Sequence, residues 1–292
     1  MRAGAAARAE DFASLRHGAT MPRFSANLSY LFTEVPFLER FAEAAQAGFR
    51  AVEFTFPYEW QARDIAERVA QHNLEVALFN APPGDAAAGD RGLASVPGRE
   101  HEFAASIATA LRYAQVLGCR RLHVMAGVVP ADADAQERSL RRRLYVRNLR
   151  QACEDALAHG ITVTIEPLNP RDVPGYLLQT QAEAHAVRAE VGAPNLKVQF
   201  DLYHAQIVEG DLTEKLRTWI AHVGHIQIAG VPGRHEPNVG EINYEWLFRV
   251  IDELHYDGWI GCEYRPLNGT AAGLAWMYRL IDRKRGGVGG KD

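Results

Sequence analysis

The chain has 292 residues, of which 47% are hydrophobic and 23% are charged, a composition typical of a globular protein rather than a disordered one. Its net charge of -4 argues against a nucleic-acid binder that depends on a basic surface. No apolar run reaches the roughly 18 residues of a membrane span, so we expect no membrane partner. The three cysteines form no C-x-x-C pair, which argues against a disulfide framework and a thiolate zinc site and predicts a cytoplasmic protein.

The two ends of the chain differ in composition from the rest. Residues 1–20 are rich in Ala and Arg and lack the apolar stretch of a secretory signal, and the end of the chain, GGVGGKD, is rich in Gly. We therefore predict a disordered N-terminal extension over 1–22, a single catalytic domain over 23–285 and a flexible tail over 286–292.

Short β-rich runs alternate with helical patterns through the predicted domain. Eight runs are apolar and nearly continuous in hydrophobicity, as expected for strands covered on both faces. These runs are 24–28, 51–55, 74–79, 121–126, 161–166, 197–201, 225–229 and 259–263.

Apolar stripes with helical spacing lie between several of these runs. The clearest stripes cover 37–45, 103–114, 144–157 and 246–254, and a glycine, a common C-cap of helices, follows each of the first three. A repeated alternation of strand and helix predicts parallel strands with right-handed crossovers.

Two architectures fit this alternation, a doubly wound open sheet and a closed barrel. No G-x-G-x-x-G follows the first strand, which weakens the dinucleotide-binding sheet. Eight units in roughly 260 residues match the usual size of a TIM barrel, so we predict a (β/α)8 TIM barrel. The long irregular stretch 81–100 is then predicted to be an active-site loop after the third strand.

Four oxygen-bearing side chains lie at or near the ends of the last four predicted strands, 26 to 36 residues apart. They are Glu166, Asp201, Gln227 and Glu263. Because reactive residues of such a barrel lie at the carboxyl ends of its strands, we expect these four to surround one point. Three neighbouring carboxylates repel one another unless a cation lies among them, and an oxygen set selects an ion such as Mg2+ or Mn2+. The alternative is that each acid caps a helix or pairs with a surface arginine.

The loops after these strands carry candidate substrate-binding residues. His204 follows Asp201 by three positions, Arg171 follows the fifth strand, and Arg234 and His235 follow the seventh. Arginine binds carboxylates through a planar, two-pronged contact, so these loops could hold an acidic substrate. His123, within the fourth strand, is predicted either to point into the barrel or to pack in the core.

Long segments of the chain resemble the hydroxypyruvate isomerase family, a branch of the xylose-isomerase-like TIM barrels. The resemblance runs from about Arg23 to Trp276. Within the family, the chain is most similar to the 2-oxo-tetronate isomerase branch. The segments that carry it are PRFSANLSYLFTEVPFLERF, AVEFTFPY, PGREHEF, VMAGVVPA, TIEPLNP, FDLYHAQ, HIQIAGVPGRHEP, GEINYEWLF and GWIGCEY.

This resemblance implies an enzyme that interconverts 2-oxo-tetronate and 3-oxo-tetronate by proton transfer through an enediolate. It implies that Glu166 and Glu263 are the catalytic pair, and that Glu166, Asp201, Gln227 and Glu263 hold a divalent metal ion. Related sugar epimerases have a histidine where Gln227 stands, which places this chain on the isomerase side.

Several alternatives to this function stay open. The substrate could be hydroxypyruvate, converted to tartronate semialdehyde, or the reaction could be the epimerisation of a ketose. A non-enzymatic carbohydrate-binding barrel is a further alternative, and a DNA-repair endonuclease is disfavoured because that chemistry needs a His-rich zinc cluster and a basic surface. The aromatic stretch 273–280 packs either on its own barrel or on a second subunit of a homo-oligomer.

Overall fold

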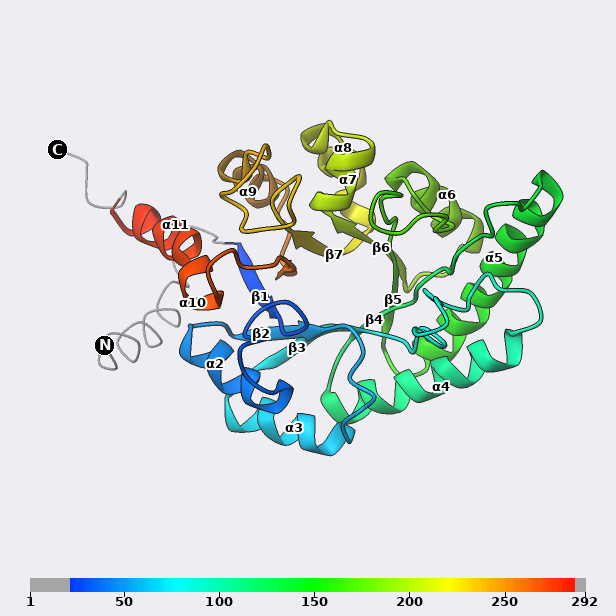
Figure 1. Cartoon of the computed structure of the whole chain (residues 1–292), viewed down its shortest axis with the longest axis horizontal. Coiled ribbons are helices and arrows are strands. Elements are labelled where there is room, and N and C mark those ends of the chain that lie inside the picture. Colours follow the sequence, from blue (N-terminus) through cyan, green and yellow to red (C-terminus); the bar gives the residue numbers. More distant parts are fainter. Residues whose placement is uncertain (1–21, 287–292) are drawn as a thin grey trace.

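The computed structural model describes residues 22–286 and shows eight parallel strands closed into a barrel in the order β1 to β8 (Figure 1). Each strand pairs with the next along the chain, and β8 pairs with β1 to close the barrel. This arrangement confirms the predicted (β/α)8 TIM barrel. Apart from Pro22 and Gly286, the predicted N-terminal extension and tail lie outside the described residues.

The strands overlap all eight predicted runs. They are β1 (Arg23–Asn27), β2 (Ala51–Phe54), β3 (Glu75–Asn80), β4 (Arg121–His123), β5 (Thr162–Ile165), β6 (Leu196–Asp201), β7 (Val223–Ile228) and β8 (Trp259–Cys262). The helices are η1 (Phe37–Glu39), α2 (Arg40–Gln46), α3 (Ala62–Gln71), α4 (Glu100–Leu117), α5 (Ala135–Leu157), α6 (Gln181–Val191), α7 (Leu202–Val208), α8 (Leu212–Trp219), η2 (Ile220–His222), α9 (Tyr244–Glu253), α10 (Thr270–Gly273) and α11 (Ala275–Gly286).

Local signals explain where several helices begin and end. The Asp134 side chain accepts a hydrogen bond from the backbone of Glu137 at the start of α5, and Thr180 and Glu183 form a capping box at the start of α6. At the end of α4, Gly118 adopts the left-handed conformation with φ of 64°, as the glycine after the apolar stripe predicts.

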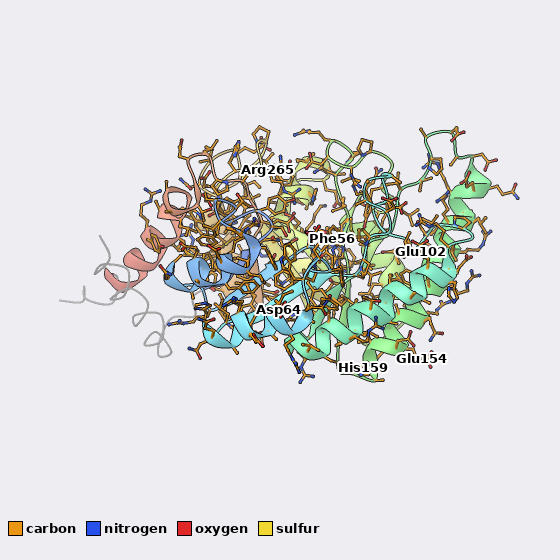
Figure 2. The ribbon with its side chains drawn as sticks, turned by 60° about the horizontal axis from the view of Figure 1, so that its bottom comes forward. Phe56, Asp64, Glu102, Glu154, His159 and Arg265 are labelled. Atoms are coloured by element: carbon orange, nitrogen blue, oxygen red, sulfur yellow. The ribbon has the colours of Figure 1, made fainter. Side chains whose placement is uncertain are left out.

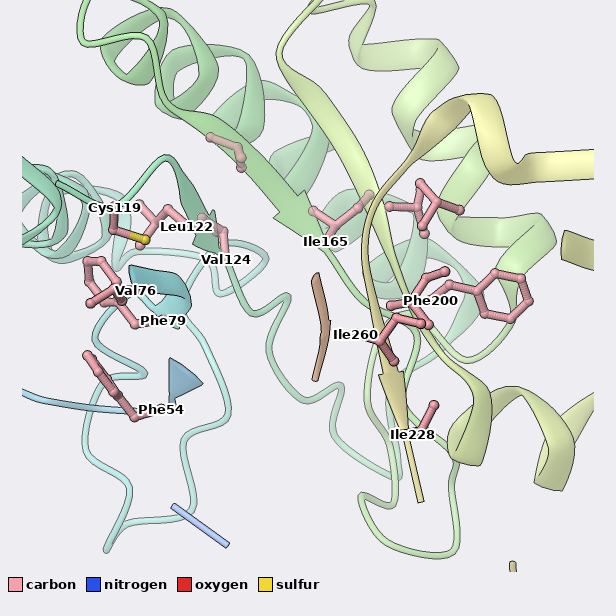
Figure 3. Close-up of a cluster of buried hydrophobic side chains, with 14 of the residues drawn as sticks. Phe54, Val76, Phe79, Cys119, Leu122, Val124, Ile165, Phe200, Ile228 and Ile260 are labelled. Atoms are coloured by element: carbon pink, nitrogen blue, oxygen red, sulfur yellow. The ribbon is translucent and has the colours of Figure 1, made fainter. Parts of the chain in front are cut away.

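The outward face of the strands forms the main hydrophobic core with the surrounding helices (Figure 3). Outward residues of the strands, such as Phe54, Leu122, Ile165, Phe200 and Ile228, are apolar and at most 1% exposed. Because successive side chains of a strand point to opposite faces, the residues between them point into the barrel. The outward positions therefore hold the helices on the sheet.

The inward face of the same strands is polar. The side chains of Ser25, Asn27, Glu53, His123, Thr164, Gln199, Asp201, His225 and Gln227 are buried. His225 of β7 contacts Glu53 of β2 over 2.8 Å, a contact between non-neighbouring strands that only the barrel interior permits. The description of the strands as nearly continuous in hydrophobicity therefore fails at the inward positions, which carry polar side chains. TIM barrels usually place branched apolar residues there.

The carboxyl ends of the strands and the opposite ends lie on different sides of the molecule. Arg265, just after β8, lies at one edge of the view in Figure 2, and His159, just before β5, lies at the other. The predicted loop after β3 contains no helix or strand over 81–99, and Ser95 within it is buried and donates its backbone N–H to Ala126 over 2.9 Å. This loop therefore has a defined path beside the strand ends.

The aromatic stretch near the end of the described chain packs on its own barrel. Trp276 of α11 makes an edge contact with Phe24 of β1, 5.1 Å between ring centroids, and stacks on Phe248 of α9 at 6.0 Å. This is the first of the two predicted placements of 273–280. Within residues 22–286, no helix combines the length and the apolar composition needed to cross a bilayer.

Candidate active site

Three buried carboxylates converge where β5, β6 and β8 end. Asp201 is the last residue of β6, and Glu166 and Glu263 directly follow β5 and β8. All three are at most 9% exposed. Asp201 also caps α7 by accepting the backbone N–H of Tyr203 over 2.8 Å, which fixes its carboxylate at the strand end. The helix-cap alternative therefore holds for Asp201 in addition to its place in the cluster.

Glu166, Asp201 and His204 form a group that could hold a metal ion. One potential ligand atom from each lies within 4.8 Å of the other two, and all three side chains are buried. Glu166 Oε1 and Asp201 Oδ2 are buried and have no hydrogen-bond partner among the residues that the structure describes. Buried carboxylate oxygens are costly without a partner, so they fit a hard divalent cation.

The tautomer of His204 follows from its contacts. The backbone N–H and the side-chain amide of Asn169 both reach His204 Nδ1, at 3.2 and 2.6 Å. A backbone N–H only donates, so Nδ1 accepts and a neutral ring carries its proton on Nε2. Burial, together with Arg234 and His123, lowers the pKa of His204 well below its ordinary value and keeps the ring neutral. His204 Nε2, 3.6 Å from Asp201 Oδ2, is therefore a hydrogen-bond donor facing the cluster, which leaves Glu166 and Asp201 as the members of the group that could bind a metal ion.

The guanidinium of Arg234 lies among the acids of the site. Its Nη2 contacts Glu263 Oε1 and lies 3.5 Å from Asp201 Oδ2, and its Nη1 lies 3.7 Å from Asp172. The rings of Tyr30 and Tyr203 lie 5.1 and 4.9 Å from its central carbon, which holds the cation between two aromatic faces. Arg234 thus partly neutralises the cluster and is itself held in one place.

The side chain of Gln227 connects two carboxylates. Its Nε2 donates to Glu263 Oε2 over 2.6 Å and to Glu53 Oε1 over 2.8 Å, while its Oε1 accepts from Gln199 over 2.6 Å. Of the predicted metal set, Glu166 and Asp201 therefore lie in the potential ligand group, and Gln227 and Glu263 are joined to each other beside it. The four-residue set stays a prediction.

The three acids hold protons more tightly than ordinary carboxyls. Burial raises the pKa of Glu263 to about 8 and that of Asp201 to about 6, although Arg234 opposes both shifts. Burial and the charges of Asp201 and Glu263 raise the pKa of Glu166 well above its ordinary value. Asp201 and Glu263 can therefore exchange a proton near neutral pH, and the raised pKa of Glu166 favours its protonated form, which suits general acid–base chemistry.

The other predicted site residues lie at different distances from this cluster. His123 points into the barrel, with Nε2 3.7 Å from Glu166 Oε2, and burial lowers its pKa to about 3. Arg171 is exposed, and its neighbour Asp172 contacts Arg234 instead. His235 is half-buried and donates from Nδ1 to the carbonyl of Arg265 over 2.8 Å, so its ring is directed at the β8 loop.

The sequence reasoning missed the polar residues on the opposite side of the barrel. Glu53 is fully buried and receives hydrogen bonds from four side chains. Its partners are Ser25 at 2.6 Å, Asn27 at 3.3 Å, His225 at 2.8 Å and Gln227 at 2.8 Å. Burial alone would raise the pKa of Glu53, but His225, Gln227 and Ser25 lower it below its ordinary value. The sequence signals are an acid in the apolar run AVEFT and a histidine two positions before Gln227, which mark each residue but not their pairing.

Comparison with known proteins gives the family. The profile of the xylose isomerase-like TIM barrel family matches residues 41–280. A 2-oxo-tetronate isomerase of Cupriavidus necator is 59% identical over 90% of this chain and all of its own length. The hydroxypyruvate isomerase of Escherichia coli is 46% identical over 88% of this chain and 98% of its own length.

Solved structures agree with this assignment. A Brucella melitensis protein described as an AP endonuclease of family 2 is 50% identical, with a TM-score of 0.86, over 89% of this chain and 99% of its own. The 3-keto-D-glucoside 4-epimerase of Escherichia coli, at 20% identity and a TM-score of 0.75 over 89% of this chain and all of its own, shares the fold. The chain therefore belongs to the xylose isomerase-like TIM barrel family, with relatives named 2-oxo-tetronate isomerase and hydroxypyruvate isomerase.

Proposed function

We propose that this isomerase interconverts 2-oxo-tetronate and 3-oxo-tetronate, using Glu166 and Glu263 to move the proton. The observation that carries the proposal is that two buried glutamates of raised pKa flank Asp201 and Arg234 at the strand ends. The substrate is that of the Cupriavidus necator relative, which this chain matches over that protein's whole length.

The proposed reaction moves one proton between neighbouring carbons. One glutamate removes the proton from the hydroxyl-bearing carbon, which leaves an enediolate, and the other gives a proton to the former carbonyl carbon. The hydroxyl proton passes to the former carbonyl oxygen, so that the carbonyl and hydroxyl groups exchange places. In the reverse direction the two exchange roles. Burial raises the pKa of both glutamates, whereas a cation bound beside them would favour their ionised forms and make them weaker bases.

Two further residues would orient the substrate. His204 donates from Nε2 to a substrate oxygen, since its Nδ1 is held by Asn169. Arg234 Nε is buried and has no hydrogen-bond partner in residues 22–286, so it donates to the substrate carboxylate. Arg171 and His235, in the same loops, stay as additional proposed contacts at the rim.

Mg2+ or Mn2+ is the proposed cofactor. Glu166 and Asp201 would hold it through their unpartnered oxygens, with Gln227 and Glu263 completing the proposed set. When bound, such an ion supplies positive charge that polarises the carbonyl and stabilises the developing negative charge. The protein residues fit this role because their donor atoms are mainly oxygen.

An assay panel tests the proposed substrate. The purified protein is incubated separately with 2-oxo-tetronate, 3-oxo-tetronate, hydroxypyruvate and a ketose, and product formation is followed by NMR. Conversion of the oxo-tetronates at the highest kcat/KM supports the proposal. A higher value for hydroxypyruvate would assign the three-carbon reaction of the Escherichia coli relative.

Isotope labelling separates isomerisation from epimerisation. When the reaction runs in D2O, deuterium at the former carbonyl carbon of the product indicates an isomerase, whereas deuterium at the carbon that lost its proton indicates an epimerase. Absence of turnover on every substrate would favour a carbohydrate-binding barrel. A duplex with an abasic site is included because of the description of the Brucella melitensis structure, and we expect no cleavage.

Removal of divalent ions tests the proposed cofactor. Treatment with a chelator followed by gel filtration should lower kcat to background, and added Mg2+ or Mn2+ should restore it. Metal content is measured by mass spectrometry in the same samples. Full activity in a sample with no detectable ion would contradict the metal assignment.

We also propose a cytoplasmic location, because Cys119, Cys153 and Cys262 are all unpaired and buried.

A further inference from the structure

Glu53 lies in the barrel interior, outside the cluster of Glu166, Asp201 and His204. It is 0% exposed, and its carboxylate accepts four side-chain hydrogen bonds from strands β1 and β7. A buried carboxylate is strongly disfavoured unless it is fully paired. The proposed proton transfer gives this residue no role, so its burial needs another explanation.

The barrel makes space for this carboxylate through Gly261 of β8. A Cβ on Gly261 would overlap both carboxylate oxygens of Glu53, so any other residue there would displace the acid. The backbone of Gly261 needs no left-handed conformation, which leaves space as the reason for a glycine. Strand β8 is thus shaped around Glu53 of β2.

Two amide groups lie between Glu53 and Glu263. The Nδ2 of Asn27 donates to Glu263 Oε2 over 2.7 Å and to Glu53 over 3.3 Å. The Nε2 of Gln227 donates to the same oxygen of Glu263 over 2.6 Å and to Glu53 over 2.8 Å. Each NH2 group therefore uses one hydrogen for each carboxylate.

The amide oxygens are engaged on their other sides. Asn27 Oδ1 accepts the backbone N–H of Ser29 over 3.0 Å, and Gln227 Oε1 accepts from Gln199 over 2.6 Å. If either amide were turned over, its oxygen would face two carboxylates and its hydrogens would lose their acceptors. The negative charge of Glu53 therefore selects the orientation that directs both NH2 groups at Glu263.

We infer that Glu53 is a positioning residue, which orients the amides of Asn27 and Gln227 so that they hold Glu263 in place for proton transfer. This inference rests on the proposed function. Glu53 itself touches neither substrate nor reacting atoms. Because a displacement of about 1 Å at a reacting group can cost roughly 100-fold in rate, loss of this arrangement should reduce turnover more than binding.

The variant Glu53→Gln tests the inference with little change in shape. The substitution removes the negative charge and replaces one of the two acceptor oxygens by an NH2 group, so the preference that directs both neighbouring amides at Glu263 is weakened. We expect kcat on 2-oxo-tetronate to fall about 30-fold while KM stays within about threefold. Glu75→Gln, an exposed acid on β3, is the matched control and should keep the wild-type kcat.

Kinetic isotope effects separate positioning from general damage. Each glutamate serves one carbon, so a defect confined to Glu263 slows proton transfer at that carbon alone. In Glu53→Gln, the deuterium effect on kcat should rise in one direction of the reaction and not in the other. An equal rise in both directions, a wild-type kcat, or a loss confined to KM would each overturn the inference.

Two further variants keep the test decisive if Glu53→Gln does not fold. Gly261→Ala should displace the Glu53 carboxylate and reproduce the one-sided isotope effect, and Ser25→Ala should do so more weakly because it removes one hydrogen bond. Wild-type isotope effects in both would overturn the inference. Failure of the wild-type protein to convert oxo-tetronates would instead contradict the proposed function.

Discussion

The two faces of the barrel strands differ completely although they belong to the same short segments. Ile165 and Glu166 are neighbours at the end of β5, yet the first packs in the outer core and the second belongs to the group of buried carboxylates with Asp201 and Glu263. Phe200 and Asp201 repeat the arrangement on β6. Alternate positions of one strand thus have different roles. The outward residues stabilise the fold, and the inward residues form the candidate active site.

The largest expected effect is a loss of activity when the inward acids are replaced. Glu166→Gln and Glu263→Gln should each lower kcat by about 10²–10⁴-fold, because each removes a group that exchanges a proton. The melting temperature should not fall, since both acids have raised pKa values and their charged forms are disfavoured in the folded state. Steady-state kinetics and thermal unfolding of the same samples measure both effects.

The exposed Glu214 of α8 supplies the control for these substitutions. Glu214→Gln removes only a surface contact with Arg217 and should leave kcat unchanged. Near-wild-type turnover in either Glu166→Gln or Glu263→Gln would remove the two-glutamate mechanism, whatever the control does.

The outward position next to Glu166 gives the opposite prediction. Ile165→Val removes one methyl group from a fully buried side chain and should lower the free energy of unfolding by about 0.5–1.5 kcal/mol. The kcat should stay within about twofold, because the carboxylate of Glu166 lies on the other face. Denaturant unfolding and kinetics test this separation, with the exposed Leu140→Ala as a control that changes neither. A fall in kcat of more than about twofold in Ile165→Val would mean that the two faces are coupled.

The outward pattern explains why the fold was predictable from the sequence. Apolar residues such as Ile226 and Ile228 recur in every strand, and helical stripes with terminal glycines separate the strands. The acids at the strand ends were predictable because parallel strands bring their carboxyl ends to one rim. Local patterns of this kind need no knowledge of distant contacts.

The Glu53 network was not predictable by the same reasoning. Glu53 and His225 lie 172 positions apart, and each appears alone within an apolar run. Only closure of the barrel brings them together, so no local spacing indicates the pair. Arg171 is a prediction from loop position that the side-chain contacts do not support. Its side chain is exposed, and the neighbouring Asp172 contacts Arg234 instead. Side-chain direction within a loop depends on contacts that the sequence alone does not reveal.

The smallest expected effect lies in the outer helix layer and concerns acid stability. His185 of α6 is buried and stacks on Trp219 at 4.1 Å, and burial, with Arg188 and His222, lowers its pKa to about 3. The unfolded ring keeps the ordinary pKa of about 6.5 and binds the proton more readily, so folding stability is lost as the pH falls from about 6.5 to about 3. His185→Phe should flatten this part of the curve of melting temperature against pH, whereas His101→Phe, at an exposed site on α4, should not. The inward acids Asp201 and Glu263, with raised pKa values, act in the opposite direction, because their protonated forms are favoured in the folded state. If the melting temperature of His185→Phe falls with pH as steeply as that of the wild type, His185 in the outer layer does not contribute to the loss of stability in acid.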